Sequence, residues 1–171
     1  MSRHSSRQSG TRAIIWFVAR FVGAWLLALG VLAVSPGIER WCIAAMTDNL
    51  LLILRAIGAD VSREGATLTV GRASLMIVAE CTIVMPMLVL GAAIIAYPAR
   101  LRWRLGGIGC GAVVLWIYNL FRVLALLAVM VWYPQLFDFV HVYLWQTFTL
   151  IVVLALFALW LRLQPVPRGT G

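Results

Sequence analysis

Charged residues are scarce in this sequence: Asp, Glu, Lys and Arg make up only 12% of its 171 residues. A soluble domain usually carries about twice that charged share. Hydrophobic residues make up 63%. This composition excludes an ordinary soluble domain and indicates an integral membrane protein. The length allows one compact unit, but not a helical bundle with a separate soluble domain beside it.

Lysine is absent, so all fourteen basic residues are arginine. The net charge of +8 would suit a nucleic-acid-binding protein, but the arginines flank hydrophobic stretches, so we expect no nucleic-acid partner. Cysteine is also rare. Cys42, Cys81 and Cys110 have neither metal-ligand spacing nor a CxxC motif. We therefore expect no metal, no cofactor and no disulfide scaffold.

Hydrophobic stretches long enough to cross a membrane occur four times. A helix needs about 20 apolar residues to span the hydrocarbon core, and the candidates are residues 13–34, 75–97, 105–132 and 142–161. The first is too long for the hydrophobic part of a signal peptide and has no small-x-small cleavage site. The sequence therefore predicts one membrane-embedded domain over residues 1–171, an all-α membrane protein with about four transmembrane helices.

Arginines without acidic neighbours set the expected orientation, because cytoplasmic segments of membrane proteins are rich in basic residues. They precede the first span, connect the second to the third and follow the fourth: Arg3, Arg7 and Arg12; Arg100, Arg102 and Arg104; Arg162 and Arg168. All six acidic residues lie elsewhere. We therefore expect four crossings of the cell inner membrane, with both termini cytoplasmic.

The connection between the first two spans contains two further predicted elements. Residues 41–58 carry one apolar stripe at helical spacing: Ile43, Met46, Leu50, Ile53 and Ile57. The same segment contains Asp48 and Arg55, and a fifth crossing there would invert the downstream orientation, so we predict a helix in the outer interface. Residues 67–70 alternate in polarity between glycines, which favours a small extracytoplasmic β-hairpin.

Reactive and ionisable side chains within the predicted spans are few. Each is a site hypothesis, because such residues are costly in a membrane. Cys81, beside Glu80, lies near the outer start of the second span, and His141 opens the fourth. Asn119 and Arg122 lie in the third, with Arg122 about 25 Å from its cytoplasmic start. The predicted topology therefore brings Cys81, Arg122 and His141 to the periplasmic face.

These residue types suit nucleophilic chemistry. A thiolate is a nucleophile, an arginine stabilises an oxyanion, and a histidine exchanges protons with the thiol and the leaving amine. Pro86 removes a helix donor, which predicts a local opening of the second span beside Cys81.

Structural interpretations of the same residues remain open. A lone cysteine in an apolar helix is usually a small packing residue, and we interpret Cys42 and Cys110 in this way. Arg122 and Glu80 are alternatively a structural ion pair, and His141 is alternatively a cap at the membrane interface.

The order of these residues resembles the exosortase/archaeosortase family of membrane sorting enzymes. The matching segments are Ala79-Glu80-Cys81-Thr82, Asn119-Leu120-Phe121-Arg122-Val123 and His141, and the likeness covers about residues 60–146. Family members often have Cys-Ser-Gly or Cys-Thr-Gly, whereas Ile83 follows Thr82 here. Many members also have more spans, so the likeness is to a short, minimal exosortase subtype.

The resemblance implies a membrane cysteine protease or transpeptidase. Cys81 would be the nucleophile, Arg122 the oxyanion stabiliser and His141 the proton shuttle, with Asn119, Glu80 and Thr82 in support. The implied substrates are exported proteins with a C-terminal motif, a transmembrane helix and a basic tail. They would be cleaved on the periplasmic side, and the new carboxyl end would pass to an amine or lipid acceptor in the membrane.

Two other functions remain as alternatives. The first is a non-catalytic membrane assembly or binding protein. The second is a small transporter, which is disfavoured because the polar residues gather at one membrane face and no paired half-helices occur.

Overall fold

The computed structural model describes residues 3–164, with side chains from Thr11 onward. Arg168, one of the arginines used above for orientation, lies outside the described residues. The elements are, in chain order, α1 (Arg3–Val34), α2 (Pro36–Ala56), β1 (Val61–Glu64), β2 (Thr67–Val70), β3 (Ala73–Met76), η1 (Ala79–Cys81), α3 (Val84–Ala96), α4 (Leu101–Trp132), η2 (Pro134–Leu136), η3 (Phe139–Leu144) and α5 (Trp145–Leu163).

Three of the four predicted spans are confirmed as long apolar helices among the described residues. Thr11–Val34, Leu101–Trp132 and Phe139–Leu163 are long and apolar enough to cross a bilayer. They contain the first, third and fourth predicted spans. The most apolar stretch of α1 has no buried residue, so this helix offers its side chains to the surroundings rather than to a protein core. The protein is therefore a mainly helical membrane protein.

The second predicted span, residues 75–97, is not a single helix, and that prediction is wrong. Leu75 belongs to β3, a 3-10 turn follows, and α3 occupies only Val84–Ala96. Its 13 residues rise about 20 Å, less than the hydrocarbon core of a bilayer. The hydrophobic run suggested a helix because Leu75 of β3 and Ile77 after it are apolar core residues. An apolar run alone does not distinguish a strand from a helix.

The expected β-hairpin is part of a three-stranded antiparallel sheet with the order β1-β2-β3. Glu64 pairs with Thr67, and Val70 pairs with Ala73, so both connections are two-residue loops. Each loop begins with a glycine at a φ of 60°. A positive φ at the first loop position is the type II′ pattern, which matches the twist of the paired strands.

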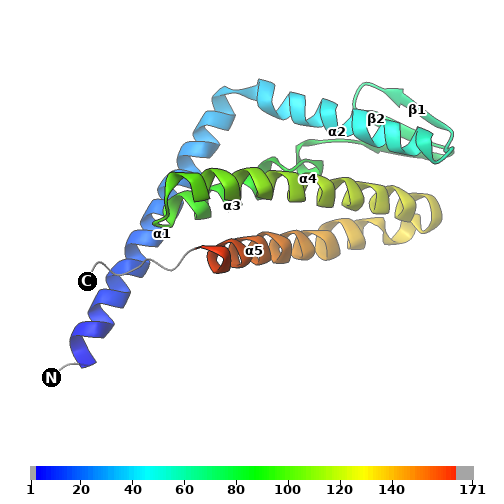
Figure 1. The fold of residues 1–171 in the computed structure, drawn as a ribbon. Helices are drawn as coiled ribbons and strands as arrows, with labels where there is room; N and C mark the ends of the chain where they lie inside the picture. Colours follow the sequence, from blue (N-terminus) through cyan, green and yellow to red (C-terminus); the bar gives the residue numbers. More distant parts are fainter. Residues whose placement is uncertain (1–2, 165–171) are drawn as a thin grey trace.

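Helix α2 lies lengthwise beside α4 (Figure 1). The rings of Trp41 and Trp116 are 6.3 Å apart, and Met46 receives a weak contact from Asn119 further along both helices. Residue numbers rise together along the two helices, so they run in the same direction. This differs from the expected interfacial helix, whose axis would lie across that of a spanning helix.

The buried stripe of α2 explains its position. Cys42, Met46, Leu50 and Leu54 recur every four residues and are at most 7% exposed, so they form one face of the helix. The sequence prediction identified Met46 and Leu50 correctly. It placed two further members, Ile43 and Ile53, one residue away from the buried positions, and a third, Ile57, beyond the end of α2.

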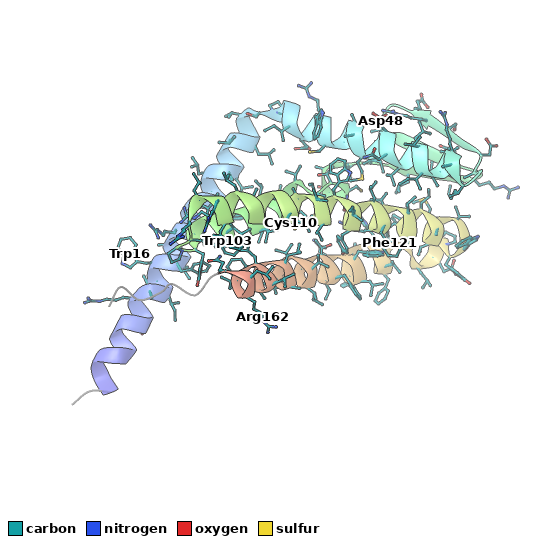
Figure 2. All side chains as sticks on the ribbon, viewed as in Figure 1. Trp16, Asp48, Trp103, Cys110, Phe121 and Arg162 are labelled. Carbon is teal, nitrogen blue, oxygen red and sulfur yellow. The ribbon has the colours of Figure 1, made fainter. Side chains whose placement is uncertain are left out.

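The two ends of the bundle differ in content. Helices α3, α4 and α5 lie side by side, and α1 crosses them obliquely (Figure 1). The sheet and the connection from α4 to α5 lie towards one end, and Trp103 and Arg162 lie towards the other (Figure 2). One buried cluster joins α2, the sheet and α4, and a second joins α3, α4 and α5.

Candidate functional site

Cys81 ends the short η1 turn that connects the sheet to α3. Its backbone N–H donates to the carbonyl of Val78 at 2.9 Å, and the residue is 4% exposed. Thr82, the next residue, donates its hydroxyl to the carbonyl of Ala79 at 2.7 Å and accepts from the N–H of Val84 at 3.4 Å. Thr82 therefore connects η1 to the first residue of α3, and this fixes the backbone that follows the thiol.

Pro86 has a different role from the expected one. It is the third residue of α3, not an interior residue of a longer helix. The N–H groups of the first turn have no partner within a helix, so proline is tolerated there. The expected opening of a continuous span at Pro86 is therefore wrong, and the chain is non-helical at Cys81 because α3 has not yet begun.

Asn119 positions the carbonyl group of the nucleophile candidate. It lies within α4, is 2% exposed, and donates its side-chain amide to the carbonyl oxygen of Cys81. A buried amide left without a partner would cost about 1–3 kcal/mol. This contact therefore connects α4 directly to the turn that carries the thiol.

Arg122 lies one turn further along α4 and is 8% exposed. One terminal nitrogen donates to the carbonyl of Glu80 at 3.3 Å, while Nε is buried without a partner. The Glu80 side chain is exposed, and the only ion pair among residues 11–164 joins Arg63 to Asp48. The structural Glu80–Arg122 ion pair, one of the alternatives, is therefore not formed.

An unpaired buried cation is costly. The effective desolvation penalty is several kcal/mol per ion, and it is offset only by a partner of opposite charge or by full hydrogen bonding. Arg122 has one long hydrogen bond to a backbone oxygen and a free Nε. The site therefore has the electrostatics of an anion-binding position beside Cys81.

His141 lies in η3, a π-helical stretch that leads into α5. Its ring stacks on Phe137 at 5.4 Å, and it lies within electrostatic range of Arg122, Glu80 and Asp138. No side-chain hydrogen bond of His141 occurs within the described residues. Direct contacts thus join Asn119 and Arg122 to the Glu80–Cys81 backbone. His141 is related to this group by the charge of Arg122 and by no hydrogen bond among the described residues.

Sequence reasoning missed the contribution of α2 to this site. Met46 is fully buried and contacts Asn119. The apolar stripe that contains Met46 could have predicted packing against another helix. It was instead interpreted as a face turned towards the membrane interface.

The other two cysteines differ from each other. All three cysteines are free. Cys42 is buried, as expected of a packing residue, and burial raises the pKa of its thiol. Cys110 is exposed, so its expected packing role is wrong. The close-packed neighbours on that helix are Gly111, against Leu90, and Gly107, against Trp160.

Comparison with known proteins gives no match: no family model, no curated protein and no solved structure is similar to this chain. Within residues 3–164, no cluster of three or more His, Cys, Asp or Glu side chains is arranged to hold a metal ion.

Proposed function

We propose that this protein is a membrane cysteine protease or transpeptidase of the exosortase type. It would cleave C-terminal sorting signals of exported proteins and transfer the new carboxyl end to an acceptor. The observation that supports this most strongly is the buried guanidinium of Arg122, which forms no ion pair with any described residue and lies at the turn that carries Cys81. Such a cation is useful when negative charge develops during a reaction.

The chemistry assigns one role to each side chain. The sulfur of Cys81 attacks the carbonyl carbon of the scissile peptide bond, and Arg122 stabilises the resulting oxyanion through its free Nε–H. His141 takes the thiol proton and gives it to the leaving nitrogen, so that a thioester and a free amine are formed. Water, an amine or a lipid hydroxyl then attacks the thioester and regenerates the thiol. Asn119 holds the Cys81 backbone in place during both steps.

The proposed orientation places the site at the periplasmic face of the inner membrane. Arg100, Arg102 and Arg104 open α4, and Arg162 closes α5, at the end of the bundle opposite the sheet (Figure 1). Basic residues favour the cytoplasmic side. In this proposal, α3 and the residues on either side of it return the chain from the level of Cys81 to the arginine-rich end, so that both termini are cytoplasmic. A substrate with a basic cytoplasmic tail would then present its recognition motif at the level of Cys81.

Thiol labelling offers an internal control. Cys81 and Cys42 are almost equally buried, at 4% and 7% exposure, and only Cys81 lies beside Arg122. In lipid nanodiscs, on a Cys110→Ser background, we expect iodoacetamide to modify Cys81 at least about tenfold faster than Cys42. The difference should disappear in the Arg122→Met and His141→Gln variants. Equal rates for the two cysteines in the parent protein would contradict the proposed nucleophile.

The reaction itself is tested in cells. Exported proteins with a C-terminal motif, one transmembrane helix and a basic tail should accumulate unprocessed when Cys81 is replaced by serine. The Cys110→Ser strain, which loses a cysteine on the exposed face of α4, should process them normally. Full processing in the Cys81→Ser strain would exclude a role for this thiol in cleavage.

A second candidate function is a non-catalytic membrane assembly or binding protein. It is favoured by the burial of Cys81 in the apolar cluster with Leu68 and Val123, as expected of a packing residue. This alternative predicts equal labelling of Cys81 and Cys42, and normal processing in the Cys81→Ser strain.

A further inference from the structure

A cavity of about 370 Å³ lies between α2, the start of α3 and α4, directly beside the candidate site. Its lining includes Trp41 and Cys42 of α2, Ile83, and Ala112, Trp116 and Ile117 of α4. Ile83 follows Cys81 by two residues, so the cavity and the thiol share one stretch of backbone.

The chemistry of the lining selects a hydrocarbon occupant. The lining presents no polar surface. A peptide or a sugar would bring N–H, C=O or O–H groups that need partners, and such groups are costly in an apolar site. The volume is also large, since an apolar cavity of about 150 Å³ already accommodates benzene. One inserted side chain would leave much of this cavity empty, whereas an alkyl chain can fill it.

The mouth of the cavity lies at a band of aromatic side chains. Trp41 meets Trp116, and Tyr118, half a turn further along α4, meets Trp145 of α5 with ring centroids 6.0 Å apart. Trp and Tyr collect at the membrane–water interface. Trp41 and Ile117 are 66% and 63% exposed, so the cavity opens to the outside of the bundle at this level.

Positive charge is present at the same level. Arg40 precedes Trp41 in α2, is exposed, and forms no ion pair with any described residue. It lies six residues after Val34, where the first candidate span ends. An arginine just beyond the end of a span can extend its long side chain to the lipid phosphates, for which the guanidinium is a suitable partner.

We propose that this cavity binds one acyl chain of a membrane phospholipid whose phosphate lies against Arg40. The chain enters between Trp41 and Ile117 and extends along α4 towards Ala112, deeper in the bilayer. The bound lipid fills the space between α2 and α4 next to the turn that carries Cys81. This site does not depend on the proposed catalytic activity.

Photo-crosslinking locates the lipid. The full-length protein is reconstituted in nanodiscs of phosphatidylcholine with a trace of phosphatidylglycerol that carries a diazirine in its acyl chain. After irradiation, we expect saturable adducts on residues 41–42 and 112–117. Ala112→Phe, which fills the cavity, should lower their yield about tenfold or more. Ala44→Phe, a matched change on the exposed face of α2, should leave the yield unchanged.

Two further variants keep the test decisive. Cys42→Phe fills the cavity from α2 and should lower the adduct yield as Ala112→Phe does. With two independent filling variants, the test does not depend on the folding of either one. Arg40→Gln should weaken competition by unlabelled phosphatidylglycerol, whereas Arg55→Gln, at the other end of α2, should not. Adducts spread evenly over α1 and α5, or adducts that survive both filling variants, would show only annular lipid and overturn the proposal. Each result can be obtained in a Cys81→Ala background, so it stands apart from the test of catalysis.

Discussion

Arg122 is the residue at which stability and function separate most clearly. It is buried within α4, and among residues 11–164 it pairs with no carboxylate and its Nε has no hydrogen-bond partner. A residue kept for folding alone would be better replaced by an apolar side chain of similar length, because removing an uncompensated buried charge is often neutral or stabilising. A buried arginine at this position is suited to an anion that forms or binds at the site.

We therefore predict that Arg122→Met keeps the fold and loses the reactivity of Cys81. The melting temperature in nanodiscs should stay within about 4 °C of the parent value, because one long hydrogen bond is exchanged for relief of a buried charge. Leu126→Ala, at a fully packed neighbouring position, serves as the destabilised control and should lose about 2–5 kcal/mol. If Arg122→Met falls as far as Leu126→Ala, Arg122 is a structural residue.

At the scale of the elements, the sequence was informative where periodicity and length agreed. The apolar runs in α1, α4 and α5 are long enough to span a bilayer as helices, so length and composition together predicted these elements. The run from Leu75 to Tyr97 was misassigned because strand, turn and short helix are all apolar there. The sequence predicted Cys81, Arg122 and His141 at one membrane face, with Asn119 in support. The structure joins Asn119 and Arg122 to the turn that carries Cys81 and leaves His141 within electrostatic range of Arg122. The contact partners were not predicted, because the Glu80 carbonyl and Met46 depend on the position of η1 and α2.

Packing of α4 against α5 depends on a glycine. A Cβ at Gly107 would overlap Nε1 of Trp160, and that indole is fixed by its hydrogen bond to the carbonyl of Trp103 at 2.9 Å. We predict that Gly107→Ala destabilises the protein by about 1–3 kcal/mol, through overpacking. Gly106→Ala meets no atom within 4 Å and should be neutral or slightly stabilising. Thermal unfolding of the two variants in one detergent compares them directly, and equal melting temperatures would refute the close packing.

At the scale of the whole molecule, the functional proposal depends on which end of the bundle is cytoplasmic. The sheet, η2 and the end of α2 lie towards one end, and the arginines of α4 lie at the other (Figure 1). Helix α4 has 32 residues and rises about 48 Å, more than a bilayer core requires. About 18 Å of α4, roughly its last 12 residues, can therefore extend beyond the hydrocarbon. The second half of α2, whose exposed face carries Asp48 and Arg55, lies beside this part.

This arrangement makes a definite prediction for accessibility. In a Cys110→Ser background, Ser62→Cys on the sheet should react with a membrane-impermeant maleimide in intact cells. Arg102→Cys, at the start of α4, should react only after the cells are permeabilised. Both native positions are exposed, so both new thiols should react equally in lysed cells, which controls for local reactivity. If Arg102→Cys is the one labelled in intact cells, the bundle is inverted. Cys81 and Arg122 would then face the cytoplasm, where an exported substrate no longer presents its cleavage site, and the sorting function would have to be abandoned even if the thiol proved reactive.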